Sequence, residues 1–202
     1  MHKLACVVSV ALLSVLAAQA QSEAPKATVY GGYSYLRNGG NGANGWNGQA
    51  TFNLNRFFGI TADVAGNYRN IASFSPVPGF STSANQHLYT YLFGPTVTGT
   101  FGNSAVFAHA LFGAARSSSS AGISLPLVGG ISSGVSSATA FAMAFGGGVD
   151  LGISRHVAIR VAQIDYVRTQ FSSLDALSTG LSTSRGGGQN SFRYSGGVVF
   201  RF

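Results

Sequence analysis

The last nine residues, YSGGVVFRF at 194–202, have the pattern of a β-strand with one apolar face. Alternate residues of a strand point to opposite faces. One face would therefore hold Tyr194, Gly196, Val198, Phe200 and Phe202, and the other Ser195, Gly197, Val199 and Arg201. The ends of soluble domains are usually frayed and polar. This segment instead predicts a strand that is ordered to its final residue, with aromatic side chains on one side.

The composition favours a protein that faces lipid. Charged residues make up 8% of the chain, against roughly 25% in ordinary soluble proteins. Disorder does not explain this low charge, because 46% of the residues are hydrophobic. A transmembrane β-barrel accounts for both values, since its outer band is apolar and its narrow interior tolerates Gly, Ser, Thr and Asn.

Residues 1–20, MHKLACVVSVALLSVLAAQA, predict a secretory signal peptide. Lys3 precedes an apolar run, and Ala18-Gln19-Ala20 forms a small-x-small cleavage site. The alternative, a membrane-anchor helix, is disfavoured because the run is short and no basic flank follows it. The single cysteine, Cys6, lies in this segment, so the mature chain would have no disulfide and no thiol chemistry.

The basic charge of the mature chain is dispersed along the sequence. Without Lys3, eleven basic and five acidic residues remain, a net charge of +6. In a nucleic-acid-binding protein this charge would gather on one face. Here attraction to anionic lipid headgroups is the better interpretation, and no nucleic-acid partner is predicted.

Eight segments of the mature chain show the alternation expected of membrane-spanning strands, and none offers the roughly 18 apolar residues of a membrane helix. The predicted strands cover residues 27–36, 45–54, 58–68, 86–98, 105–115, 137–151, 156–167 and 190–202. The inward face of 105–115 is ambiguous, because both faces are apolar apart from His109. In 156–167 the alternation slips near Ala162-Gln163. A β-bulge there would turn Arg160, Gln163 and Asp165 inward and Ile164 and Tyr166 outward.

The predicted connections alternate in length. Residues 55–57, 99–104 and 152–155 form short turns, whereas 37–44, 69–85, 116–136 and 168–189 are mostly long and rich in Gly, Ser and Asn. Outer-membrane barrels have short periplasmic turns and longer external loops. The same barrels carry aromatic girdles at both membrane interfaces. The outer girdle would contain Tyr33, Tyr35, Trp46, Tyr68 and Tyr89, and the inner one Phe57, Phe58, Phe101, Phe200 and Phe202.

Two parts of the sequence carry a family resemblance. Ser195-x-Gly197-x-x-Phe200-x-Phe202 resembles the C-terminal signal of outer-membrane barrels, which implies recognition by the barrel assembly machinery. The stretches VYGGYSYLR, GWNGQATFNLNRFFGITADVAGNYR, LFGP, FAHALFGAAR, GGGVD and AIRVAQIDYVRT resemble the OmpA-like, porin-type β-barrel domain family. The resemblance implies an outer-membrane protein with an eight-stranded, antiparallel, up-and-down transmembrane β-barrel. The expected organisation is a signal peptide at 1–20, a short lead at 21–26 and the barrel at 27–202.

Two motifs suggest chemistry that their context does not support. Gly130-Ile131-Ser132-Ser133-Gly134 matches the nucleophile-elbow pattern, but it lies in a Gly/Ser-rich segment with no helix signal after it. The stretch 40–45, GNGANG, matches a dinucleotide-binding pattern but precedes a strand rather than a helix. The mature histidines His87, His109 and His156 lie on separate segments without ligand spacing, so no metal site and no cofactor is predicted.

Charged residues on the predicted inward faces form the candidate site: Asp63, Asp150, Arg160, Asp165, Arg193 and Arg201. Side chains fill the interior of an eight-stranded barrel, and buried charges must be paired. We therefore expect an internal Asp/Arg network that plugs the lumen. The functional alternative is an active site or a gated pathway that uses the same groups.

The function we expect is non-enzymatic: a structural or surface-interaction role in the outer membrane, with four external loops, lipid contact and an extracellular ligand bound by the loops. Two alternatives stay open. A porin-like channel for small solutes is disfavoured because eight strands leave no aqueous channel. A lipid-modifying enzyme would need a Ser/His/acid set at the outer rim, and no mature histidine is clearly placed to serve one.

Overall fold

The computed structural model describes residues 25–39, 41–74, 81–125, 129–170 and 188–202. The predicted signal peptide and residues 21–24 of the predicted lead lie outside these residues. Within them, no helix is long and apolar enough to cross a membrane.

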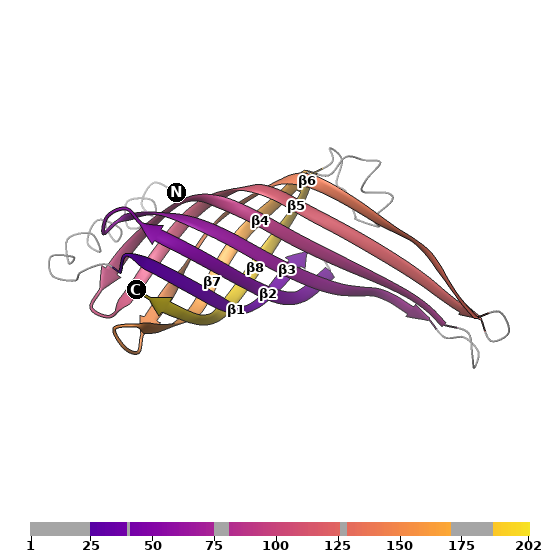
Figure 1. Ribbon diagram of the computed structural model, residues 1–202, viewed down its shortest axis with the longest axis horizontal. Helices are drawn as coiled ribbons and strands as arrows, with labels where there is room; N and C mark the ends of the chain where they lie inside the picture. Colours follow the sequence, from indigo (N-terminus) through magenta and orange to yellow (C-terminus); the bar gives the residue numbers. More distant parts are fainter. Residues whose placement is uncertain (1–24, 40, 75–80, 126–128, 171–187) are drawn as a thin grey trace, which may run out of the picture.

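Eight antiparallel strands close into a barrel in sequence order, which confirms the predicted fold class (Figure 1). The strands are β1 (Ala27–Asn38), β2 (Asn41–Asn53), β3 (Phe58–Phe74), β4 (Ser81–Phe101), β5 (Ser104–Leu125), β6 (Gly129–Gly152), β7 (Val157–Gln170) and β8 (Gly188–Arg201). Each strand is hydrogen-bonded to its neighbours in sequence, and β8 pairs with β1. Closure leaves no strand at a sheet edge over the body of the barrel, as lipid requires.

The C-terminal segment makes the closing seam of the barrel. β8 pairs with β1 from Thr28 opposite Arg201 to Arg37 opposite Phe192. The ladder continues to the last residue, because the Phe202 amide donates to the Ala27 carbonyl at 2.9 Å and the Ala27 amide donates back at 3.2 Å. The terminal strand therefore has a partner along its whole length, as its sequence predicts.

The predicted alternation of faces is confirmed by side-chain exposure. Phe52 and Phe93 are each 60% exposed on the outer surface, whereas Asp63 and Asp165 on the inner surface are 0% exposed. In β5, which the pattern left ambiguous, His109 and Leu111 are buried inside the barrel. The apolar outer band faces lipid, and the polar residues are enclosed.

The predicted bulge in β7 is present. The register between β7 and β8 shifts between Arg160 and Gln163. Arg160, Gln163 and Asp165 are buried, and Ile164 is 51% exposed. One extra residue in the strand thus brings three polar side chains to the lumen, where simple alternation would place two of them in lipid.

The strands are longer than predicted on the side opposite the short turns. β4, β5 and β6 contain 21, 22 and 24 residues. Most of the segments predicted as loops at 69–85 and 116–136 are strand. Within 37–44, residues 37–38 and 41–44 are also strand, Asn38 lies opposite Asn41, and Gly39 has a φ of +57°. These loop predictions were wrong because backbone pairing in water needs no apolar alternation. Of the last predicted loop, residues 171–187 lie outside the described part of the chain.

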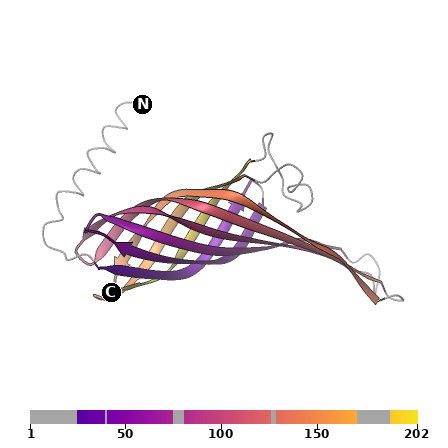
Figure 2. The same cartoon turned by 45° about the horizontal axis from the view of Figure 1, so that its top comes forward.

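Strands β3–β6 continue as a sheet beyond the rest of the barrel (Figures 1 and 2). The β2–β3 pairing ends at Asn44 opposite Tyr68, and the β6–β7 pairing ends at Phe141 opposite Gln170. β3, β4, β5 and β6 remain paired with one another past those points. We call residues 69–74, 81–86, 119–125 and 129–140 the projecting sheet.

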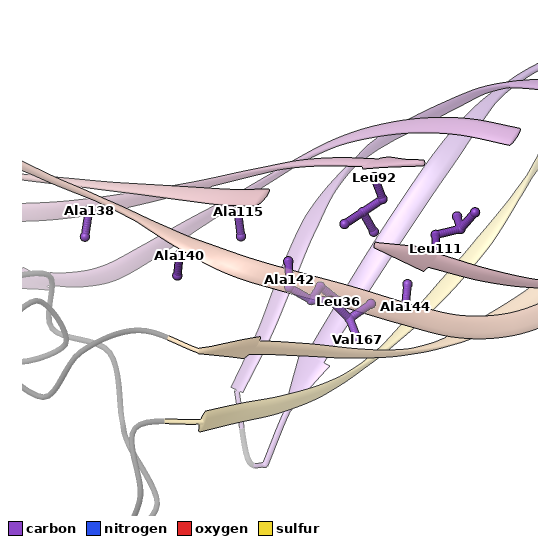
Figure 3. Packing of buried hydrophobic residues seen from close by; sticks show 9 residues of the cluster. All are labelled: Leu36, Leu92, Leu111, Ala115, Ala138, Ala140, Ala142, Ala144 and Val167. Atoms are coloured by element: carbon purple, nitrogen blue, oxygen red, sulfur yellow. The ribbon is translucent and has the colours of Figure 1, made fainter. Parts of the chain in front are cut away.

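Small apolar side chains line the inner face of the barrel and the start of the projecting sheet (Figure 3). β6 contributes an alanine at every second position because the barrel interior is too narrow for larger residues along this strand. The buried cluster comprises Leu36, Leu92, Leu111, Ala115, Ala138, Ala140, Ala142, Ala144 and Val167.

Adjacent glycines in β8 give a test of the closing seam. A Cβ atom on Gly197 would collide with the backbone carbonyl of Gly31, whereas a Cβ on Gly196 would lie 3.4 Å from its nearest neighbour. We expect Gly197→Val to lower the free energy of unfolding by about 1–3 kcal/mol. The measurement is urea-induced unfolding of protein refolded into detergent, read by the heat-dependent shift on a denaturing gel. Gly196→Val is the control and should change stability by less than about 0.5 kcal/mol. Equal losses in the two variants would contradict the seam packing.

Candidate functional site: the lumenal ion-pair network

Arg193 on β8 lies at the centre of the polar network. Its Nη1 and Nη2 donate to the two carboxylate oxygens of Asp63 at 2.8 and 3.0 Å. Its Nε and Nη2 donate to Asp165 Oδ2 at 2.9 and 2.8 Å. All three side chains are essentially inaccessible to solvent. One guanidinium thus joins β8 to β3 across the lumen and to the adjacent β7, in the bidentate geometry that gives strong ion pairs.

Two side-chain amides also donate hydrogen bonds to Asp63. Asn47 Nδ2 donates to Asp63 Oδ2 at 2.8 Å, and Gln49 Nε2 donates to the same oxygen at 2.7 Å. Both amides project from β2, the strand beside β3. Both carboxylate oxygens of Asp63 therefore accept hydrogen bonds, which offset much of the free-energy cost of burying this charge.

Arg160 forms a second centre nearer the short turns. Its Nε and Nη2 donate to Asp150 at 2.7 and 3.1 Å, and its Nη1 donates to Gln49 and Gln163. The guanidinium carbon lies 4.2 Å from the centroid of the Tyr30 ring and 4.1 Å from that of Phe107. The Arg160 charge is thus held by one carboxylate and two aromatic faces.

His109 connects β5 to this network. Its Nε2 lies 2.9 Å from Asp165 Oδ1. An ionised carboxylate only accepts, so Nε2 carries the proton. Gln163 Nε2 donates to the other oxygen of Asp165 at 2.7 Å. Three carboxylates therefore face two guanidinium groups, and the histidine supplies a further donor.

Glycines make room for these side chains. A Cβ on Gly146 would collide with Asp165 Oδ1 and with the Ile164 carbonyl. A Cβ on Gly148 would lie 2.9 Å from the Phe107 ring, which stacks on Arg160. The GGG run at 146–148 in β6 thus leaves space for the network.

The structure brings together five of the six predicted charged residues: Asp63, Asp150, Arg160, Asp165 and Arg193. Arg201 lies apart, and its Nη1 donates to the backbone carbonyl of Asn103 at 2.6 Å. The sequence prediction did not include Asn47, Gln49 and His109, which are polar partners of the charged network. The alternation in 45–54 placed Asn47 and Gln49 on one polar face, whereas the facing of His109 was ambiguous, and the strand register that pairs these residues was not readable.

The predicted outer-girdle residues lie on the outside of the barrel, toward the projecting sheet. Trp46 Nε1 donates to the Tyr68 hydroxyl at 3.2 Å, and the Tyr68 and Tyr89 hydroxyls lie 3.3 Å apart. Tyr33 and Tyr35 are also exposed there, and the Tyr33 hydroxyl donates to Asn44. Phe58, Phe101, Phe200 and Phe202 are exposed toward the short turns, and Phe57 is half-buried there. The two sets therefore lie at opposite ends of the barrel.

The residues of the predicted assembly signal lie in the closing strand. Ser195 is buried, and Gly197 packs against the backbone of β1. Phe200 and Phe202 are 49% and 70% exposed on the lipid face. Recognition of these residues by the assembly machinery stays a prediction.

The two misleading motifs lie in strands. Residues 130–134, predicted to lie in a loop, belong to β6, and residues 41–45 belong to β2. Among the described residues, no group of three or more His, Cys, Asp or Glu side chains is placed to hold a metal ion. His87 packs against Tyr68 with ring centroids 5.2 Å apart, and His156 is exposed in a turn.

This geometry defines a class of protein: a small transmembrane β-barrel whose lumen is filled by paired charges and an apolar cluster. The family model for the outer membrane protein beta-barrel domain matches residues 7–202. The chain therefore belongs to the outer membrane protein β-barrel family, and its location is the cell outer membrane. A search of curated proteins found no match to this sequence.

Solved structures with the same fold include two of Ail, the attachment invasion locus protein of Yersinia pestis. One is 16% identical with a TM-score of 0.53. The other, a complex with the heparin analogue sucrose octasulfate, is 17% identical with a TM-score of 0.55. Each alignment covers 89% of this chain and 100% of the Ail chain. The N-terminal β-barrel domain of Pseudomonas aeruginosa OprF aligns over 89% of this chain and 100% of its own, with 11% identity and a TM-score of 0.42. At these identities, the likeness to Ail concerns the fold alone.

The central arginine gives a test of the network. Arg193→Leu would leave Asp63 and Asp165 without their shared cation, and we expect a loss of about 3–5 kcal/mol in the free energy of unfolding. The measurement is denaturant unfolding in detergent micelles, followed by tryptophan fluorescence. Arg168→Leu is the matched control, because Arg168 is exposed on the neighbouring strand β7. A loss at Arg193 no larger than at Arg168 would contradict the proposed importance of the network.

Proposed function

We propose that this protein has a structural and surface-interaction role, in which the barrel anchors the projecting sheet at the cell surface. The observation that carries this proposal is the continuation of β3–β6 beyond the barrel rim. In this family short turns face the periplasm, so the opposite end of the barrel faces the outside. A paired sheet offers a rigid binding surface, which lowers the entropy lost on association compared with a free loop.

The ligand we propose is an anionic extracellular polymer. Three arginines, Arg37, Arg116 and Arg168, are exposed near the outer end of the barrel, on β1, β5 and β7. Exposed guanidinium groups attract sulfate and carboxylate groups at a distance. The structure of Ail with a heparin analogue offers a precedent on the same fold.

Shortening the β5–β6 hairpin tests this role. Ser118 pairs with Ser137, so replacing residues 119–136 by Asn-Gly would join the two strands by a two-residue turn. We expect the shortened protein to keep its heat-dependent gel shift and expressing cells to bind immobilised heparin more weakly, because Arg37, Arg116 and Arg168 remain but the rigid sheet beside them is lost. Full binding by a folded, shortened barrel would contradict a role for the projecting sheet.

We also propose that the barrel contacts outer-membrane lipid, is inserted by the barrel assembly machinery, and works without catalysis. The histidine that contacts a carboxylate, His109, is enclosed in the lumen beside Phe107, where the lipid of the outer leaflet does not reach it. The ion-pair network and the apolar cluster fill successive levels of the lumen, which argues against a diffusion pore.

These functional alternatives have separate readouts. We expect the folded protein to give no steady conductance in planar bilayers, because side chains fill the lumen of a barrel this small. We expect mass spectra of lipid A from expressing cells to match those from cells that carry an empty vector. Stable single-channel steps would favour a porin, and loss or gain of an acyl chain would favour an enzyme.

A further inference from the structure

A cavity of about 600 Å³ occupies the end of the barrel at the short turns. Its lining includes Arg160 and His109 of the ion-pair network, Phe107 beside them, and turn residues such as Asn103 and Arg155. Because short turns face the periplasm in this family, the cavity lies at the periplasmic end. We call it the periplasmic vestibule. Its volume falls in the range of roughly 300–1,000 Å³ that is typical of small-molecule sites.

The vestibule carries an excess of positive charge. Its cationic lining residues are Lys26, Arg56, Arg155, Arg160 and Arg201. Among the residues that the structure describes, Asp150 is the one carboxylate side chain in the lining, and it is paired with Arg160 at 2.7 Å. The remaining cations come from the segment before β1, two turns and β8. A concave site enclosed by low-dielectric walls strengthens the field of such charges and attracts anions.

Arg201 is a partly buried cation whose hydrogen bond reaches a neutral group and not a carboxylate. Nη1 donates to the neutral carbonyl of Asn103 at 2.6 Å. Nη2 is buried and has no hydrogen-bond partner among the described residues. Asp150 is close enough to interact electrostatically with Arg201, but both oxygens of that carboxylate accept hydrogen bonds from Arg160. The charge of the partly buried Arg201 is therefore only partly compensated. An anion in the vestibule would compensate this charge.

Hydroxyl groups line the same cavity. They belong to Thr28, Thr51, Thr61, Thr96, Thr98 and Thr100. Thr51, Thr61 and Thr96 form a chain of hydrogen bonds of 2.7 and 2.6 Å across β2, β3 and β4. Hydroxyls can donate to an oxyanion after small rotations, so this wall suits a ligand with several oxygen atoms.

We propose that the periplasmic vestibule binds a small anion that carries one or more phosphate groups. Guanidinium groups match the tetrahedral oxygens of phosphate, and cations on several elements suit a multivalent anion better than a single carboxylate. Because the cavity lies at the short turns, the anion would enter from the periplasm. Its source is either a soluble phosphate compound or the headgroup of a phospholipid in the inner leaflet.

The first experiment is a calorimetric titration of the full-length folded barrel, in nonionic detergent at physiological ionic strength, with inorganic pyrophosphate. We expect saturable binding of one anion per barrel. Arg201→Gln should weaken this binding about tenfold, the value for a lost charge-assisted hydrogen bond. Arg155→Gln, in an exposed turn, should weaken it several-fold without affecting the fold. Gln170→Ala, at the outer end of β7 and exposed, is the control and should leave Kd unchanged.

The outcomes are distinct. Absence of saturable binding by a barrel that keeps its heat-dependent gel shift would overturn the proposal, as would equal Kd values for the wild type and both vestibule variants. If Arg201→Gln fails to fold, the Arg155→Gln result alone decides. Glycerol phosphate and phosphatidylglycerol doped into the micelles distinguish the sources. Binding of glycerol phosphate supports a soluble ligand, and competition by phosphatidylglycerol alone supports a lipid headgroup.

Discussion

The pairing of β8 with β1 is the constraint on which the rest of the structure depends. In lipid, an unpaired backbone amide or carbonyl costs several kcal/mol, so a sheet that spans the membrane must close. Here closure extends to the final residue, because Phe202 and Ala27 exchange backbone hydrogen bonds. Glycines at the seam let the two strands approach, as Gly197 lies against the backbone of Gly31 and Gly32. Once the sheet is closed at eight strands, the middle of the lumen is narrow, and the inward side chains there must be apolar or paired.

The inward side chains are apolar at one level of the lumen and charged but paired at another. Toward the outer surface, alanines of β6 and a few larger side chains form an apolar filling. Beneath it, Arg193 and Arg160 pair with Asp63, Asp165 and Asp150. Such pairs add little net stability compared with apolar packing, but the loss of one partner is costly. Since Arg193 contacts carboxylates on β3 and β7, the network also favours one register among the strands it connects, and the filled lumen suits a membrane anchor.

Much of the fold was predictable because lipid imposes a strong pattern on the sequence. The outer face must be apolar wherever a strand crosses the membrane, so Trp46, Phe52, Phe93 and similar residues marked the strands and their facing. Even the bulge in β7 was readable, since Arg160, Gln163 and Asp165 could not all point inward without one. The prediction failed where the strands leave the membrane. Residues 69–85 and 116–136 have the composition of loops, yet much of both segments is paired strand, because backbone hydrogen bonds do not depend on side-chain polarity.

The sequence by itself determined the class of the protein, its strand count and which charges face inward, because these follow from local alternation and from the cost of exposing charge to lipid. Only the tertiary structure decided which inward residues meet. Arg193 is 130 positions from Asp63, and Arg160 is 111 positions from Gln49, so the contacts depend on barrel stagger and not on spacing along the chain. The same applies to Arg201, which reaches the turn at Asn103 instead of a carboxylate, and to the cationic vestibule. Closure of the barrel brings distant segments together around the vestibule. No local sequence pattern predicts which of their residues line it.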